Sequence, residues 1–204
     1  NSGVGGDDEP AAQAPPAVAT LSAAEIRSAA RATGIPRRAL TAYVDAAARI
    51  ERDDPTCRIS WNTLAGIGSS ESSHGAFGGA SLDAGGVASP LIIGVPLDGT
   101  GGNRAIADTD GGELDGDTTW DRAVGPLQFI PTTWAQWGAD GDDDGVMNPH
   151  DIADAALAAG RYLCDAGDDL SVSEGWSRAV LTYNQSGAYA RKVSRTAAEY
   201  ARAL

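Results

Sequence analysis

The sequence predicts a mainly α domain of the α+β class with a small β-hairpin insertion. Apolar residues recur at helical spacing on both sides of the chain's middle, residues 75–122 interrupt this pattern with a Gly- and Asp-rich stretch, and no internal repeat is evident. The 204 residues suffice for one well-cored domain, which we place at residues 21–204. Residues 1–20 are Gly, Pro and Ala with a short acidic run, so we expect a flexible N-terminal linker.

Two helices are predicted before residue 55. The first opens with the capping-box pair Ser22 and Glu25 and stops at Gly34. The second has Pro36 in its first turn and runs to about Arg52. Its apolar face consists of Leu40, Tyr43, Val44, Ala47 and Ile50.

A third helix carries an acidic residue on its inner face. Trp61, Leu64 and Ile67 have the spacing of a core-facing stripe, and Glu71 is the next position on that stripe. Burial against apolar groups raises the pKa of a carboxyl, as a general acid near neutral pH requires. The alternative is that the helix ends by Gly68 and that Glu71 is a solvated loop residue.

The stretch over residues 75–122 contains two short β-prone runs, 91–95 and 104–107. Asp-Gly and Gly-Gly pairs separate them, so we expect these runs to pair as a hairpin. A loop of this length usually lines a binding site, and we expect it to form one wall of a groove. Its acidic residues fit no metal-loop register and are interpreted as a Gly-Asp turn segment rather than a second metal site. They are Asp108, Asp110, Glu113, Asp115 and Asp117.

Residues 140–151, DGDDDGVMNPHD, match the spacing of an EF-hand-like metal loop. The predicted ligands are Asp140, Asp142, Asp144, the Val146 carbonyl, Asn148 and Asp151, and Gly145 permits the sharp turn. Asp151 stands where Glu is usual, and its shorter arm weakens affinity or favours the smaller Mg²⁺. The alternative is an acidic solvated turn without a metal.

Helices resume after residue 124, the first of them over residues 131–137. Three later stripes are Ile152, Ala156, Ala159 and Leu163; Trp176, Ala179, Val180 and Tyr183; and Tyr189, Val193, Ala197 and Tyr200. Gln128, Tyr183 and Asn184 place polar groups at helix ends among apolar neighbours. Taken alone, each such residue is more often structural than a ligand contact.

Charge and motif content exclude several partners. With 15 basic and 28 acidic residues, the net charge of -13 argues against the phosphate contacts of nucleic-acid binding. No apolar run approaches the roughly 20 residues that span a bilayer. Nucleotide-binding, zinc-protease and serine-hydrolase motifs are lacking, so we expect no organic cofactor. A monomer is the default expectation.

The chain has two cysteines, Cys57 and Cys164. In an exported domain two cysteines usually pair, whereas in a cytosolic domain they are usually separate thiols. We favour a disulfide between them.

Four motifs, in this order, resemble the lytic murein transglycosylases, and most closely the B-type branch in its actinobacterial secreted form. They are Glu71-Ser72 after a Gly-x-Gly helix, residues 121–134 (DRAVGPLQFIPTTW), the acidic loop, and Tyr183-Asn184. The resemblance covers about residues 57–200. Leu127 stands where the family often has Met, a swap of similar volume.

The resemblance implies a lysozyme-like helical domain that cleaves the β-1,4 bond between MurNAc and GlcNAc in peptidoglycan glycan strands. It implies no catalytic water, because the C6 hydroxyl of MurNAc attacks its own C1 and leaves a 1,6-anhydro end. Glu71 is then the acid and afterwards the base, and Ser72, Gln128, Tyr183 and Asn184 match positions that hold the sugar or orient the carboxyl. The metal loop is by resemblance a structural calcium site. The location is then extracytoplasmic, secreted or in the cell envelope, with residues 1–20 as a candidate tether.

Two other functions stay open. One is a muramidase in which Asp110, Asp115 or another loop carboxylate activates water. The other is a non-catalytic, calcium-stabilised peptidoglycan-binding module. The transglycosylase itself does not require paired carboxylates, because its nucleophile comes from the substrate.

Overall fold

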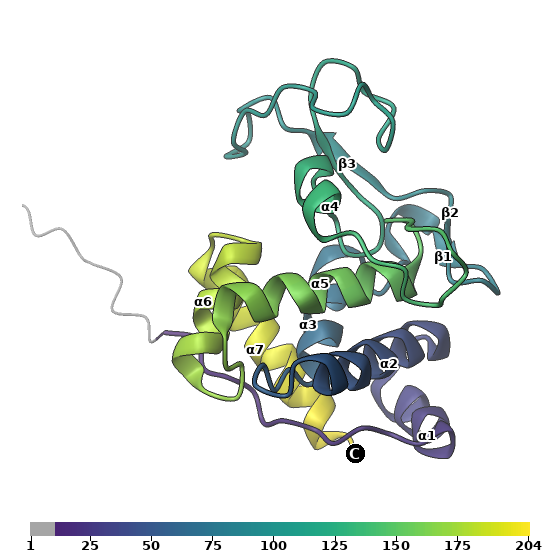
Figure 1. Ribbon diagram of the computed structural model, residues 1–204, viewed down its shortest axis with the longest axis vertical. Helices are drawn as coiled ribbons and strands as arrows, with labels where there is room; N and C mark the ends of the chain where they lie inside the picture. The colour runs from purple at the N-terminus through teal and green to yellow at the C-terminus, as the bar shows by residue number, and fades with distance from the viewer. Residues whose placement is uncertain (1–10) are drawn as a thin grey trace, which may run out of the picture.

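The computed structural model describes residues 11–204 and consists of a helical body with an excursion above it (Figure 1). The body is formed by α1 (Ala23–Thr33), α2 (Arg37–Asp53), α3 (Trp61–Ser72), α5 (Ile152–Gly167), α6 (Ser173–Tyr183) and α7 (Gly187–Arg202). The excursion, residues 73–151, holds α4 (Pro131–Trp137) and four short strands. The mainly helical class predicted from the sequence is confirmed. No described helix has the length and apolar character needed to cross a membrane.

Helix α3 lies at the centre of the body and packs against α2, α5 and α7. Its residues 61–68 are all buried. Gly66 permits the close approach of α7, because a Cβ there would lie 2.9 Å from the carbonyl oxygen of Val193. The helix continues through Ser72, so Glu71 lies in its last turn and the alternative end at Gly68 is wrong.

The helix ends follow the sequence signals closely. The capping box of Ser22 and Glu25 opens α1, and Gly34 ends it in the left-handed conformation with φ +74°. Pro131 occupies the first turn of α4. The side chain of Asp151 caps α5, where it accepts hydrogen bonds from the backbone N–H groups of Ala153 and Asp154.

The disulfide predicted from the two cysteines is confirmed. Cys57 and Cys164 are bonded, with their Cα atoms 5.3 Å apart. The bond joins the segment before α3 to the last turns of α5 across a sequence separation of 107 residues. It therefore fixes the base of the central helix to its neighbour.

The excursion contains a small antiparallel hairpin as predicted, but it is not formed by the two runs at 91–95 and 104–107. β1 (Ser81–Leu82) pairs with β2 (Ala88–Ser89), and β3 (Ile93–Pro96) pairs antiparallel with β4 (Arg122–Val124). The predicted partner of the first run, residues 104–107, takes part only in isolated bridges. The acidic turn segment folds on itself, with Asp108 accepting three backbone N–H groups, and so returns the chain to β3 at Arg122.

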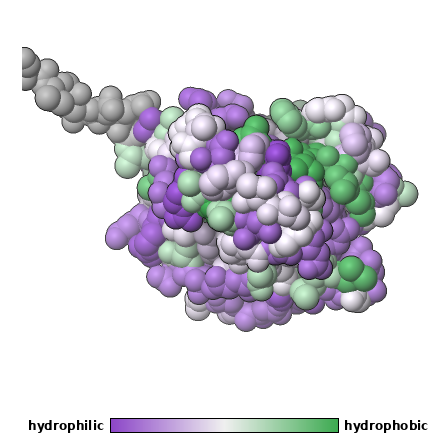
Figure 2. All heavy atoms as spheres, turned by 90° about the horizontal axis from the view of Figure 1, so that it is seen from above, coloured by the Kyte–Doolittle hydropathy of each residue, from purple (hydrophilic) through white to green (hydrophobic). Residues whose placement is uncertain are grey.

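The surface of the excursion is partly apolar. Phe77, Leu91 and Val95 are more than half exposed, at 66%, 54% and 64%. Figure 2, seen from above, shows hydrophobic surface gathered on one side of this face, with polar residues around it.

Residues 11–20, which we call the N-terminal strap, run along the helical body to α1 (Figure 1). Ser60 accepts from the Val18 N–H at 2.9 Å, and Asn62 Nδ2 donates to the Pro16 carbonyl at 2.9 Å. The Ser177 hydroxyl of α6 donates to the Ala12 carbonyl at 2.5 Å. The second half of the predicted linker is thus hydrogen-bonded to the domain. Its first half, residues 1–10, lies outside the described residues, and the domain boundary at residue 20 stays a prediction.

Candidate active site

Glu71 is a partly buried carboxyl in the last turn of α3. Its Oε1 accepts a hydrogen bond of 2.5 Å from the phenol of Tyr189 on α7. Burial raises the pKa of Glu71 from its ordinary value of 4.5 to about 7, and the Tyr189 hydrogen bond and the Lys192 charge lower it by less. Near neutral pH the group therefore exists in both the acid and the carboxylate form.

The turn after Glu71 is fixed by the neighbouring serine. Ser73, His74 and Gly75 have φ values of +52°, +61° and +86°. The buried Ser72 hydroxyl donates to the Pro126 carbonyl at 2.6 Å and accepts from the Gly75 N–H at 2.8 Å. Ser72 thus ties the end of α3 to the turn over residues 125–128, so its structural contribution is to position Glu71.

His74 forms a second support, which the sequence analysis did not assign. Its Nδ1 lies 3.1 Å from the phenol oxygen of Tyr43 on α2, and its Nε2 lies 2.9 Å from that of Tyr200 on α7. Burial lowers the pKa of His74 to about 4, so the ring is neutral at neutral pH. The ring links α2 to α7 directly behind the turn that follows Glu71.

A groove with a volume of about 740 Å³ runs between the excursion and the end of α6. Gln128, Tyr183 and Asn184 all line it, so the structure brings three of the predicted substrate-binding residues together. The Tyr183 phenol donates to the Leu127 carbonyl at 2.7 Å. Burial, and after it the charge of Glu71, raises the pKa of Tyr183.

The floor of the groove is aromatic. The rings of Phe129 and Tyr183 meet edge to face with centroids 6.0 Å apart, and those of Tyr162 and Tyr183 are 5.8 Å apart. Gln128 has φ +53°, and its side-chain amide donates to the Gly125 carbonyl at 3.0 Å. Apolar ring faces with amide groups at their edges are the surface that a sugar ring binds.

The predicted metal loop brings together a different set of carboxylates. Oxygens of Asp140, Asp142 and Asp154 lie within 4.8 Å of one another. Asp154 is 2% exposed, and it accepts from the N–H groups of Gly141 at 2.6 Å and Asn148 at 2.8 Å. Asp151 instead turns to cap α5, because it immediately precedes the first helical residue. The carboxylate that lies with Asp140 and Asp142 is thus that of Asp154, one helical turn after Asp151, and the prediction of Asp151 as a metal ligand stays a prediction.

This carboxylate group suits a hard cation. Its donors are all oxygens, which Ca²⁺ and Mg²⁺ prefer. Burial, together with the charges of Asp151 and Asp142, raises the pKa of Asp154 to about 6. A divalent cation would offset this repulsion. Asp144 is exposed, and its carboxylate accepts from the Val146 N–H at 2.7 Å.

The acidic turn segment holds its carboxylates by backbone hydrogen bonds. Asp110 accepts from the N–H groups of Gly112 and Leu114, and Asp115 from those of Asp117 and Arg122. Asp108, Asp110 and Asp121 also bring oxygens within 4.8 Å of one another. The bonds explain how a Gly-rich segment keeps a defined shape.

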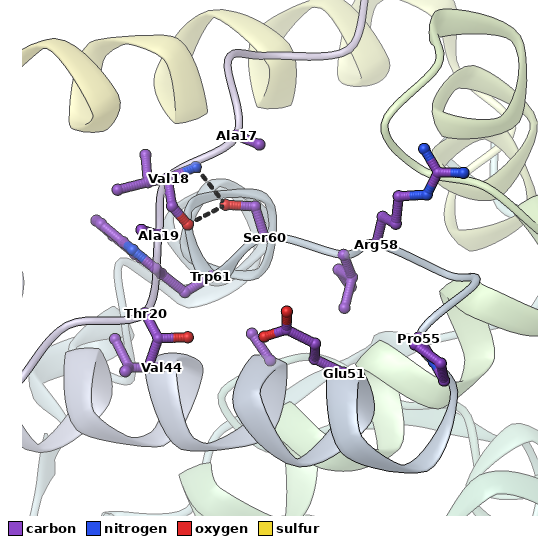
Figure 3. Close-up of a pocket in the computed structure, with 12 residues that line it drawn as sticks. Ala17, Val18, Ala19, Thr20, Val44, Glu51, Pro55, Arg58, Ser60 and Trp61 are labelled. Carbon is purple, nitrogen blue, oxygen red and sulfur yellow. Dashed lines mark hydrogen bonds between the residues drawn. The ribbon is translucent and has the colours of Figure 1, made fainter.

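Another cavity lies at the opposite end of α3 (Figure 3). It has a volume of about 350 Å³ and lies between the N-terminal strap, α2 and Trp61, with Glu51 and Arg58 among its lining residues. Trp61 precedes Glu71 by ten helical positions, which is roughly 15 Å along the helix. This cavity is therefore separate from the carboxyl.

Comparison with known proteins concerns the fold and residues 106–178. Residues 106–178 match the family model described as Transglycosylase SLT domain. Among solved structures the chain is similar to the Escherichia coli lytic transglycosylase Slt35 in complex with bulgecin A. The identity is 13% and the TM-score 0.54, over 90% of this chain and 76% of that one, so the likeness shows the fold. No curated protein sequence matches the chain.

The sequence match covers residues 106–178, from the excursion to the middle of α6, and the structural similarity covers the fold. Together they support an enzyme of the lytic transglycosylase class with a lysozyme-like fold.

Three residues near these sites were missed from sequence alone. Tyr189 was assigned only to a core stripe, although its polar tip near a helix start was a signal. His74 was assigned no role. Asp154 stands three residues after the cap of α5, on the side that faces the loop.

Proposed function

We propose that the chain is a peptidoglycan lytic transglycosylase that cleaves the β-1,4 bond between MurNAc and GlcNAc and forms 1,6-anhydroMurNAc. The observation that carries the proposal is a single partly buried carboxyl whose pKa is raised by burial to about 7 and whose charge acts on Tyr183, a residue of the groove. Such a group can both give and accept a proton at neutral pH.

In this mechanism the protonated Glu71 gives its proton to the glycosidic oxygen as the bond from that oxygen to C1 of MurNAc breaks. The carboxylate then takes the proton of the C6 hydroxyl, whose oxygen forms the new bond to C1. Glu71 is therefore protonated again at the end of the reaction, and no water is consumed. The Tyr189 hydroxyl stabilises the carboxylate form that exists between the two transfers, because it donates to that carboxylate.

We assign the groove residues to substrate binding. Tyr183 offers a ring face, and Gln128 and Asn184 offer amide groups along the same groove. Ser72 orients the carboxyl, because its hydroxyl ties the end of α3 to the turn at Pro126. The motifs that carry these roles are those of the B-type branch, to which we assign the chain.

Hydrolysis by a second carboxylate is less well supported. The groups that shift the pKa of Glu71 are Tyr189 and Lys192, together with burial, and no carboxylate is among them within the described residues. Asp110 and Asp115, the candidate bases, each use both oxygens on backbone N–H groups of their own loop.

We further propose that the loop over residues 140–154 holds Ca²⁺ through Asp140, Asp142 and Asp154, with Asp144, the Val146 carbonyl and Asn148 as further candidates. Mg²⁺ suits the site less well because it demands near-ideal octahedral geometry. A bound cation would join the loop to the first turn of α5 and stabilise only the folded chain.

The same proposal covers location and partners. The substrate is the glycan strand of peptidoglycan, which lies outside the cytoplasm, and the disulfide is typical of an oxidising compartment. We propose a secreted or envelope-bound monomer, on which residues 11–20 pack as the N-terminal strap.

The deciding experiment is mass spectrometry of the soluble products from purified peptidoglycan. The wild-type chain should release anhydro-muropeptides, and Glu71→Gln should release none. Glu51→Gln removes an exposed carboxylate from α2 and serves as the matched control. Products with reducing MurNAc ends would contradict the proposal and indicate a hydrolase. No products from the wild type would contradict it and indicate a binding module.

A further inference from the structure

The groove carries charges that the cleavage chemistry does not use. Among its described lining residues the charged side chains are Arg104 and Arg178, both basic, although the chain has a net charge of -13. The remaining lining near Tyr183 is aromatic, aliphatic or neutral and polar. A basic region in an acidic protein favours an anionic group on the ligand.

Arg178 is a cation fixed on the α6 wall. Its Nε donates to the Ala166 carbonyl at 3.0 Å and its Nη2 to the Gly167 carbonyl at 2.8 Å, both in the last turn of α5. Asp168 lies 3.1 Å from Nη2 and Glu174 lies 4.0 Å from Nη1, so two carboxylates partly offset the charge of Arg178. Arg178 precedes Tyr183 by five positions on the same helix, which is roughly 7.5 Å along its axis.

Arg104 stands on the opposite wall, in the excursion. A bridge between Asp98 and Ala105 and a 2.8 Å hydrogen bond from the Ile106 N–H to the Leu97 carbonyl hold its segment in place. The nearby Asp98 carboxylate is turned to Thr100, which donates to it from both its N–H and its hydroxyl. No ion pair engages Arg104 within residues 11–204, so its guanidinium is available to a ligand.

We infer that Arg104, which lines the same groove as Arg178, binds a carboxylate of the substrate and makes the enzyme selective for anionic glycan strands. The inference rests on the proposed function and names its substrate class. Two sources can supply the carboxylate. One is the lactyl group of a MurNAc that carries no peptide, and the other is a free carboxyl of a stem peptide.

The expected size of the effect follows from the exposure of Arg104. A charge-assisted contact at an open groove is worth roughly a three- to tenfold change in kcat/KM. Salt screens such a contact, so the effect should shrink in about 0.5 M NaCl. A packing role for the side chain would not depend on salt or on the charge of the substrate.

The test compares wild type, Arg104→Ala, Arg104→Lys and Arg27→Ala on three preparations of one peptidoglycan. The preparations carry intact stems with free carboxyls, stems whose carboxyls have been amidated chemically, and no stems. Arg27 is an exposed residue of α1 and provides the matched loss of one positive charge. Co-sedimentation of Glu71→Gln, with and without Arg104→Ala, measures binding to the same insoluble material independently of turnover.

Arg104→Ala should lose roughly three- to tenfold in kcat/KM and in binding on the carboxylate-bearing substrate, and Arg104→Lys should recover most of this. On amidated stems the loss should shrink towards onefold. A loss confined to stem-free glycan assigns the carboxylate to the lactyl group, which is free only there, and a loss confined to intact stems assigns it to the peptide. Equal losses on intact and amidated stems, or no loss on any of the three preparations, would overturn the inference. If the wild type releases no products, the proposed function fails, and the co-sedimentation ratio still decides the role of Arg104.

Discussion

The end of α3 and the start of α5 each carry a buried carboxyl, and the two are arranged in opposite ways. Glu71 stands in the last turn of its helix, where the helix dipole disfavours an anion, and it has one hydroxyl donor in Tyr189. Asp154 stands in a first turn, where the dipole favours an anion, and two backbone N–H groups donate to it. Burial raises the pKa of Glu71 to about 7 and that of Asp154 to about 6.

The two sites show how a carboxyl whose pKa is raised by burial can serve either proton transfer or cation binding. Glu71 has no carboxylate among the described groups that shift its pKa, so its buried negative charge is most readily neutralised by a proton. Asp154 lies with Asp140 and Asp142, and a group of three carboxylates at a helix start is better relieved by a divalent cation. The first site is suited to catalysis and the second to stability.

The largest expected effect is that of Glu71→Gln on turnover. Because the variant can neither give nor take the proton, the rate of anhydro-muropeptide release should fall by about 10²- to 10⁴-fold. The fold should be retained, since glutamine keeps the Tyr189 contact, and thermal unfolding provides the control. A variant that unfolds below the assay temperature, or that keeps its rate, would contradict the assignment of catalysis to Glu71 and of stability to the site of Asp154.

Metal removal should act on stability. If Ca²⁺ is present at about 100 times its dissociation constant, chelation should lower the free energy of unfolding by roughly 2.7 kcal/mol. Asp154→Asn should abolish the dependence of the melting temperature on Ca²⁺, whereas Asp151→Asn should retain it and lose only a helix cap. Equal responses of the two variants to Ca²⁺ would remove Asp154 from the site.

The pH dependence of the rate and of stability should further distinguish Glu71 from Asp154. Its protonated form is needed for the first step, so the rate should fall about tenfold per pH unit above the pKa of about 7. Since the folded pKa lies above the ordinary value of 4.5, the folded state binds more protons between these values, and stability should decline as pH rises through that window. Urea unfolding at pH 5 and pH 8 should show this decline in the wild type and a smaller one in Glu71→Gln.

The smallest expected effect is that of Tyr189→Phe. The Tyr189 hydrogen bond lowers the pKa of Glu71, so its loss should move the alkaline limb of the rate profile to higher pH, by roughly half to one unit. Tyr200→Phe removes a phenol from the same helix that contacts His74 instead, and it should leave the limb in place. A shift in both variants, or in neither, would contradict a direct action of Tyr189 on Glu71.

The helices were predictable because each has a local cause. The capping box of Ser22 and Glu25, Pro131 in a first turn and the apolar stripes are all visible within one segment, and the structure contains each element. Glu71 was predictable for the same reason, because its place on the stripe of α3 follows from helical spacing alone.

The pairings were less predictable because they join distant segments. The run at residues 91–95 could have paired with either of two later segments, and the folding of the acidic turn selected Arg122–Val124. The metal loop shows the same limit. Its spacing favoured Asp151, but the start of α5 turned that side chain to the backbone and left Asp154 to face the loop.

The sequence by itself determined the helical class, the identity of the candidate acid and the acidic loop, since composition and periodicity are local properties. Only the tertiary structure decided the environments. It placed Tyr189 on Glu71 across a separation of 118 residues and brought Arg104 and Arg178 to one groove. Burial and hydrogen bonding set a carboxyl's pKa, and both depend on which distant segments the fold packs around it.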